Sequence, residues 1–170
     1  MTAQGPRRLT LVRHAKSDWG VASLDDFDRP LNKRGERDAP EMAARLAAAG
    51  LVPGRIITSP AVRALATAQC FAAALGCPAS RIVKAQSAYL ASAGQLLEVV
   101  RQHGGRSRHV MLVGHNPGIS SFCVRLTGDD SKGDVPTCAV MSLVVPDIAW
   151  SRLDFGAARL DFYDFPKNHR

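Results

Sequence analysis

The sequence predicts an α/β fold in which a mostly parallel central sheet is covered by helices on both faces. Short apolar runs typical of strands are each followed by a segment with helical periodicity, and this unit occurs four times in succession. Strands joined by helical crossovers pair in parallel, because the helix carries the chain back to the starting edge of the sheet. The 170 residues are 46% hydrophobic and 22% charged, which suffices for one buried core and excludes a disordered chain.

The first strand is predicted over Arg8–Arg13, a short β-rich run. The polar segment Lys16–Asn32 that follows is longer than a simple connection, which is typical of functional loops. The first helix is predicted to begin at Asp38, because Asp38 suits the N-cap and Pro40 the first turn. Gly50 is predicted to end this helix.

The remaining elements follow from the same signals. Further strands are predicted over Arg55–Thr58, Arg81–Ala85, His109–Val113 and Ala139–Val145, with an edge strand or extended segment between Leu160 and Phe165. Further helices are predicted from Ser59 to Gly76, over Ala93–His103 and around Ile119–Leu126. There is no internal repeat or compositional break, so we predict a single domain over residues 1–170, in which residues 1–6 form a loose tail and no cap domain is inserted.

The cysteines and the apolar runs exclude several classes of protein. The four cysteines, Cys70, Cys77, Cys123 and Cys138, form no C-x-x-C pair, so neither a zinc knuckle nor a redox motif is expected. No run resembles a secretory signal or reaches the length of a transmembrane helix. The sequence therefore predicts a cytoplasmic protein with reduced thiols and no membrane partner.

Chemically active side chains follow three of the predicted strands. Arg13 and His14 end the first strand, the segment Ser59–Arg63 leaves the second, and Gly114–Gly118, which contains His115, leaves the fourth. Ligands of such sheets bind at the carboxyl ends of the strands, where helix N-termini also favour anions. Two histidines and two arginines are thus predicted to surround a negatively charged group.

A metal site is the main alternative for two clustered histidines, with Asp18 as an available third ligand. Two arginines at the same edge would repel a cation, so we predict no metal and no other cofactor. The other histidines, His103, His109 and His169, fall away from the carboxyl ends and are predicted to be structural or solvated.

These residues resemble a known family. The segment Leu11–Ser17 resembles the Arg-His signature of the histidine phosphatase superfamily, which includes phosphoglycerate mutase. Pro30–Gly35, Thr58–Ala64 and Gly114–Pro117 resemble the further marks of that superfamily, in the same order. Asp26–Leu31, together with the first signature, is similar to the smaller SixA-type phosphohistidine phosphatase branch. The resemblance implies a phosphoglycerate mutase-like three-layer sandwich.

The resemblance also implies roles for individual residues. His14 would be the nucleophile that accepts the phosphoryl group, and Arg13, Arg63 and a protonated His115 would complete the phosphate pocket without a metal. Ser17 and Asn116 are further candidates for substrate binding.

One departure from the family bears on the substrate. Many members carry a carboxylic general acid just after the third strand, but Gln86–Ser92 contains neither Asp nor Glu. Asp18, Asp25 and Glu98 are acids that the sequence does not place. Imidazole needs less protonation to depart than an alkoxide, since its reference pKa is about 6.5. The missing acid therefore favours a phosphohistidine substrate displayed on a protein.

Two other functions stay open. One is a phosphatase for small phosphate monoesters, and the other is a non-catalytic module that binds phosphoproteins. The net charge of +7 invites a nucleic-acid partner, but basic residues alternate with acids in Asp25–Asp38 and no nucleic-acid motif is present. We therefore expect a phosphorylated protein or a small phosphate ester as partner, and no nucleic acid.

Overall fold

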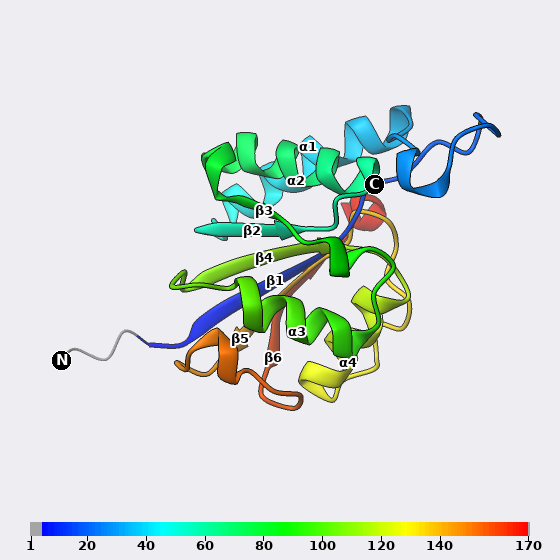
Figure 1. Ribbon diagram of the computed structural model, residues 1–170. Coiled ribbons are helices and arrows are strands. Elements are labelled where there is room, and N and C mark those ends of the chain that lie inside the picture. Colours follow the sequence, from blue (N-terminus) through cyan, green and yellow to red (C-terminus); the bar gives the residue numbers. More distant parts are fainter. Residues whose placement is uncertain (1–4, 170) are drawn as a thin grey trace.

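Six strands form one sheet between two layers of helices (Figure 1). The computed structural model describes residues 5–169. The strands are β1 (Arg7–Arg13), β2 (Arg55–Thr58), β3 (Ile82–Lys84), β4 (His109–Gly114), β5 (Val140–Val145) and β6 (Arg159–Asp164). The main helices are α1 (Lys33–Ala48), α2 (Val62–Leu75), α3 (Ala93–His103) and α4 (Gly118–Thr127).

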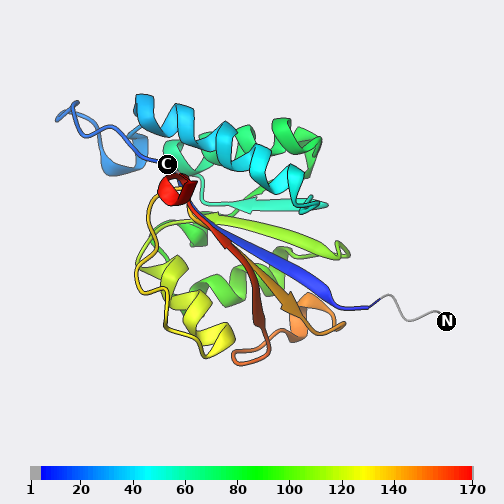
Figure 2. The same ribbon diagram turned by 180° about the vertical axis from the view of Figure 1, so that it is seen from behind.

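The strand order is β3-β2-β4-β1-β5-β6. Strands β1 to β4 pair in parallel, whereas β5 and β6 run antiparallel to their neighbours. Helices α1 and α2 cover one face, and α3 and α4 cover the other, as the front and back views show (Figures 1 and 2). The predicted α/β sandwich and its edge strand near the C-terminus are confirmed.

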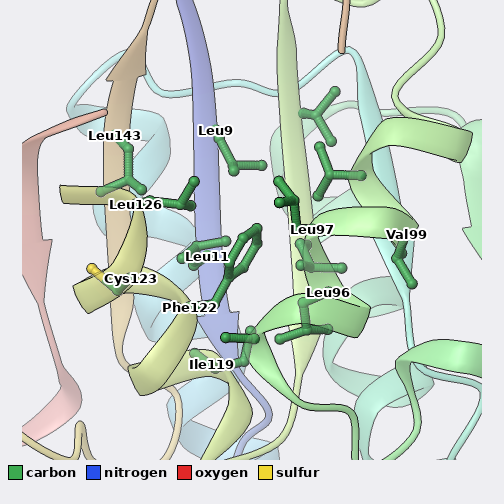
Figure 3. Packing of buried hydrophobic residues seen from close by; sticks show 14 of the residues in the cluster. Leu9, Leu11, Leu96, Leu97, Val99, Ile119, Phe122, Cys123, Leu126 and Leu143 are labelled. Carbon is green, nitrogen blue, oxygen red and sulfur yellow. The ribbon is translucent and has the colours of Figure 1, made fainter. Parts of the chain in front are cut away.

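Alternating side chains of the strands form a separate core on each face. Leu9 and Leu11 of β1 pack with α3 and α4, whereas Val12 packs with α1 and α2. Figure 3 shows Phe122 of α4 beside Leu11 and close to the α3 side chains. A strand places successive side chains on opposite faces, so the near-continuous apolar runs are those of strands buried on both faces.

The start of α1 differs from the prediction. The helix begins at Lys33 instead of Asp38, and the Asn32 side chain caps it by accepting a hydrogen bond from the Gly35 backbone N–H at 2.8 Å. Pro40 therefore lies inside the helix. Asp38 is completely buried and forms ion pairs with Arg34 and Arg37 of the same helix. The Asp38 carboxylate therefore balances the charge of neighbouring arginines and does not cap the helix, although Asp is a residue type common at N-caps.

The ends of the chain add little to the sheet. Of the predicted loose tail, residues 1–4 lie outside the described residues, and Gly5 and Pro6 precede β1 without regular secondary structure. No helix between residues 5 and 169 is long and apolar enough to cross a membrane. No part of that range folds into a separate cap over the carboxyl ends of the strands (Figure 1). One shared sheet supports the single-domain organisation that we propose from the sequence.

Candidate active site

Strand register brings three chemically active segments to the same edge. Strand β4 lies between β1 and β2, with Gly114 opposite Arg13 and Val113 opposite Thr58. The next residue of each strand is therefore His115, His14 and Ser59, respectively. The parallel order thus explains why side chains separated by up to about 100 positions in the sequence meet in one pocket.

The His14 imidazole is held in one tautomer. Its Nδ1 lies 2.7 Å from the Ala15 carbonyl oxygen, which can only accept, so Nδ1 carries the proton. Its Nε2 is therefore unprotonated, and in the free protein it accepts a hydrogen bond from the Arg63 Nε–H at 3.3 Å. Burial, followed by the nearby His115 and two arginines, lowers the pKa of His14 to about 3. A pKa this far below physiological pH leaves the ring neutral.

The backbone around His14 is held on both sides. The His14 N–H donates to the Gly114 carbonyl at 3.0 Å, and the Cys138 N–H donates to the carbonyls of Arg13 and His14 at 3.0 and 3.1 Å. Cys138 reaches them with a φ of +61°, which is uncommon for a non-glycine residue. Thr67 Oγ1 then accepts from the Ala15 N–H at 3.0 Å. These bonds orient the candidate nucleophile before any ligand binds.

Arg63 is almost fully buried, and three groups hold its guanidinium. Besides the bond from Nε to His14, Nη1 donates to the Asp26 carbonyl at 2.6 Å, and Nη2 donates to Asp26 Oδ2 at 2.9 Å. Nη2 also lies 3.3 Å from His115 Nδ1, which accepts its second hydrogen. The Arg63 charge is therefore fixed between both histidines.

His115 differs from the prediction in its protonation state. Its Nδ1 accepts from Arg63, so Nε2 carries the proton and donates to Ser59 Oγ at 2.8 Å. Burial and then the Arg63 charge lower the pKa of His115 to about 4, against a smaller opposing effect of Asp26. His115 is neutral in the free protein, because an imidazolium would lie buried beside guanidiniums without enough compensating negative charge.

A carboxylate that the sequence analysis did not select lies in the site. Asp26 accepts hydrogen bonds from Arg63, from Nε and Nη2 of Arg29 at 3.2 and 2.8 Å, and from the Tyr89 hydroxyl at 2.5 Å. Burial alone would raise the pKa of Asp26, but the hydrogen bonds from Tyr89, Arg29 and Arg63 hold it well below the ordinary value. The available sequence signal was the Asp26–Leu31 segment, which places this acid three residues before Arg29.

The other predicted binding residues have mixed surroundings. Arg13 donates from Nη1 to the Val135 carbonyl at 2.8 Å, while its buried Nε has no hydrogen-bond partner among residues 5–169. An unsatisfied buried donor favours a ligand rich in acceptors. Ser17 accepts from Arg29 Nη1 at 2.7 Å. The Asn116 amide is already engaged with the Val135 carbonyl and with Ser120, so it shapes the turn more than it offers free donors.

The acids that the sequence left unplaced lie elsewhere. Asp18 accepts from the Gly20 N–H, Asp25 is exposed, and Glu98 pairs with Arg101 on the outer side of α3. The remaining histidines also lie away from the pocket. His109 contacts Thr10 at 2.7 Å at the opposite end of the sheet, and His169 pairs with Asp164.

A polar pocket of about 210 Å³ opens between these groups. Four of its lining residues are cationic and two are histidines, alongside one carboxylate and five neutral residues. Lys16, Trp19, Leu90 and Thr137 complete the lining, together with the residues described above. No three His, Cys, Asp or Glu side chains within residues 5–169 are grouped so that they could hold a metal ion. The pocket is suited to an oxyanion beside a neutral imidazole.

Comparison with known proteins agrees with this chemistry. The family model described as histidine phosphatase superfamily (branch 1) matches residues 9–84. The structure superimposes on a protein of Agrobacterium tumefaciens described as the phosphohistidine phosphatase SixA, with a TM-score of 0.79 and 30% identity over 95% of this chain and 99% of that chain. The chain belongs to the histidine phosphatase superfamily.

Two further relatives of this histidine phosphatase superfamily chain extend the comparison. A Nakamurella multipartitia protein described as SixA gives a TM-score of 0.76 at 25% identity, covering 98% of this chain and 99% of that chain. An uncharacterized chloroplastic protein of Arabidopsis thaliana is 33% identical over 152 residues, which are 85% of this chain and 69% of the relative. The family and its SixA-type neighbours support a phosphatase, a hydrolase acting on a phosphorylated substrate.

Proposed function

We propose that this histidine phosphatase removes the phosphoryl group from phosphohistidine on a protein, through a covalent intermediate on His14. The observation that carries the proposal is the His14 tautomer: Nδ1–H is bound to the Ala15 carbonyl, so Nε2 is the unprotonated nitrogen, and it lies beside Arg63 at the pocket. A neutral nitrogen nucleophile next to cationic donors is what phosphoryl transfer requires.

The reaction has two balanced steps. When phosphohistidine binds, the Arg63 Nε–H turns from His14 Nε2 to a phosphoryl oxygen, and the freed lone pair attacks phosphorus in line. The bond between phosphorus and the substrate imidazole breaks, and that imidazole, protonated from solvent on its other ring nitrogen, departs as a neutral ring. Water then attacks the phosphoryl group on His14, loses a proton, and the Nε2–phosphorus bond breaks to release phosphate. Arg13 and Arg63 stabilise charge on the equatorial oxygens without any metal.

The state of Asp26 favours phosphohistidine over an alkyl phosphate. It is the carboxyl group that the pocket contains, and hydrogen bonds from Tyr89, Arg29 and Arg63 keep it ionised. An ionised carboxylate holds no proton to give to a departing alkoxide. Imidazole departs without strong acid assistance, since its ordinary pKa is about 6.5.

We further propose that Asp26 is a positioning residue. Its carboxylate and its carbonyl both accept from Arg63, while Arg29 and Tyr89 hold the carboxylate in turn. This arrangement keeps the Arg63 guanidinium beside His14, where it can donate to the oxygens of the transferred phosphoryl group. Ser17 supports it indirectly by accepting from Arg29.

The test is turnover on a protein phosphorylated on histidine, followed by phosphorus NMR, against a panel of sugar and nucleotide phosphates. His14→Ala is expected to lose both the acid-labile phosphoenzyme and hydrolysis, whereas His103→Ala, outside the pocket, is expected to keep both. A chelator is expected to leave the rate unchanged.

Three results would contradict parts of this proposal. Hydrolysis by His14→Ala at nearly the wild-type rate would remove the nucleophile assignment. Preferential turnover of alkyl phosphates would favour the small-ester alternative, and phosphate binding without turnover on any substrate would favour a non-catalytic binding module. The cytoplasmic location and the identity of the partner protein stay predictions from the sequence.

A further inference from the structure

Exposed apolar side chains gather around the pocket. Six large apolar residues are exposed among the described residues, and five of them lie on segments at the carboxyl edge of the sheet. These are Trp19, Val21, Leu24, Val62 and Leu90, whereas Val52 precedes β2 at the opposite edge. Trp19 and Leu90 line the phosphate pocket itself. A polar small substrate has no use for such surroundings, so this distribution points to a larger partner.

Leu90 is the most unusual of these residues. Its side chain is 57% exposed, and its φ of +49° lies in the left-handed region that a bulky residue rarely adopts. The neighbouring backbone is held tightly, because a Cβ atom on Gly118 would come within 2.0 Å of the Ala91 carbonyl oxygen. The fold therefore presents an apolar side chain to solvent from a strained and rigid position, which is typical of functional segments.

A second hollow continues from Leu90. It has a volume of about 410 Å³ and runs between the start of α3 and the start of α4, along Leu90, Ala91, Ala93, Pro117 and Gly118. Its other lining residues, Ser92, Gln95 and Ser121, are polar but uncharged. Leu90 belongs to both hollows, so the cationic phosphate pocket and this apolar groove form one continuous surface.

We propose that Leu90 and this groove bind apolar side chains that flank the phosphohistidine of a protein substrate. The inference rests on the proposed function and adds the feature by which the substrate is selected. The charges match this occupant: the anionic phosphoryl group meets the arginines at the floor, and uncharged neighbours of the phosphohistidine meet the groove. A sugar or nucleotide phosphate places hydroxyl groups or further charges there and gains nothing from apolar contact.

The experiment compares two peptides of equal length, each carrying one histidine phosphorylated with potassium phosphoramidate. Leucine flanks the phosphohistidine in one peptide and serine in the other. The full chain is tested as wild type, as Leu90→Asn and as Val52→Asn. Asparagine tolerates the left-handed backbone, so Leu90→Asn removes apolar surface without added strain. Val52→Asn is the matched control, because Val52 is 47% exposed at the opposite edge of the sheet.

The wild-type protein is expected to hydrolyse the leucine-flanked peptide with a kcat/KM about tenfold higher, mainly through KM, since burying one such side chain contributes an affinity of this order. Leu90→Asn is expected to bring the ratio of the two kcat/KM values to about twofold or less. Val52→Asn is expected to keep the wild-type ratio.

Equal rates on both peptides, or an unchanged ratio in Leu90→Asn, would overturn the proposal. Sedimentation velocity at the assay concentration tests whether a second copy of this chain occupies the groove instead. A dimer that Leu90→Asn dissociates would show that a second copy of this chain fills the groove, and would overturn it as well. If the wild type hydrolyses neither peptide, the proposed function itself is contradicted. If it hydrolyses both at equal kcat/KM and the activity depends on His14, only the proposed role of the groove is contradicted.

Discussion

The neutral state of His14 follows from its burial. A charged imidazole at this position would lie beside Arg63 and His115 and away from water, so its pKa falls to about 3. We expect NMR titration of the free protein to find His14 and His115 neutral at pH values down to about 5, because their pKa values are lowered to about 3 and about 4. Titration of His14 near its ordinary value of about 6.5 would contradict this.

A bound oxyanion is expected to shift the pKa of His115 more than that of His14. Orthovanadate placed among Arg13, Arg63 and His115 adds negative charge beside a ring that burial and the Arg63 charge now hold unprotonated. We expect it to raise the pKa of His115, because an adjacent anion favours the imidazolium. The protonated His115 inferred from the sequence would then describe the loaded site instead of the free one.

Asp26→Asn tests whether Asp26 acts through Arg63. The amide keeps the size of the side chain but loses the charge and one acceptor, so Arg63 is held less firmly. We expect kcat to fall by about 10- to 100-fold, the order expected for a displaced catalytic group, with a smaller change in KM. Steady-state kinetics on a phosphohistidine protein provides the measurement. Asp28→Asn, an exposed acid of the same short helix, serves as the control.

A double-mutant cycle then separates positioning from general stability. In the Arg63→Ala background, Asp26→Asn is expected to cost little further activity, because the group it positions is already absent. Multiplicative losses in the double variant would mean that Asp26 acts independently of Arg63. The free energy of unfolding, measured for each variant, shows whether a loss of activity merely reflects a loss of folded protein.

Among the elements, helix α1 depends on one close backbone approach. A Cβ atom on Gly35, in its first turn, would lie 2.2 Å from the Lys16 carbonyl oxygen. That contact packs the start of α1 against the chain just beyond His14. The Pro30–Gly35 segment thus has a steric role in holding the segment after the nucleophile in place.

Gly35→Ala is therefore expected to lower the free energy of unfolding by about 1–3 kcal/mol, the usual cost of overpacking. Gly94→Ala, in the first turn of α3, meets only the Ser92 side chain at 4.0 Å. It is expected to raise the free energy of unfolding by about 0.5–1 kcal/mol, since alanine is the better helix residue. Urea denaturation of both variants measures the difference. Equal stability of the two would contradict the close approach.

At the scale of the whole molecule, three histidines that are buried or half-buried contribute to the acid stability. Burial is the main cause that lowers the pKa of His14, His109 and His115 to about 3, about 4 and about 4. As pH falls below about 6.5, the unfolded chain binds protons that the folded chain does not. Their contribution to stability is therefore complete above that pH and is lost progressively as pH falls towards the folded pKa values.

Urea midpoints measured between about pH 7.5 and about pH 4.5 are expected to decrease steadily towards acid, and more than the ordinary carboxylates alone would cause. His109 lies outside the pocket and contacts Thr10, so His109→Gln keeps a hydrogen-bonding group there while removing one titration. This variant is expected to reduce the histidine contribution to the slope by about one third, since one of three groups is lost. If His109→Gln leaves the pH dependence of the urea midpoint unchanged, His109 does not contribute to the acid stability.

The sequence by itself determined the α/β class, the order of the elements and the residues Arg13, His14, Arg63 and His115 at the strand ends. These features are local, because apolar periodicity and strand-to-helix boundaries are written in neighbouring residues. The start of α1 is not decided by local sequence, because Asn32 and Asp38 both suit an N-cap. Only the packing of Gly35 against Lys16 makes Asn32 the N-cap.

Only the tertiary structure decided which side chains touch and which are charged. Asp26 entered the site because Arg63, Arg29 and Tyr89, from three separate segments, converge on its carboxylate. The neutral state of His115 likewise depends on burial and on surrounding charges that no local pattern encodes. Contacts between distant segments and the exclusion of water arise only when the chain is folded. The sequence therefore predicted a pocket for an anion, but neither the presence of Asp26 in it nor the protonation state of His115.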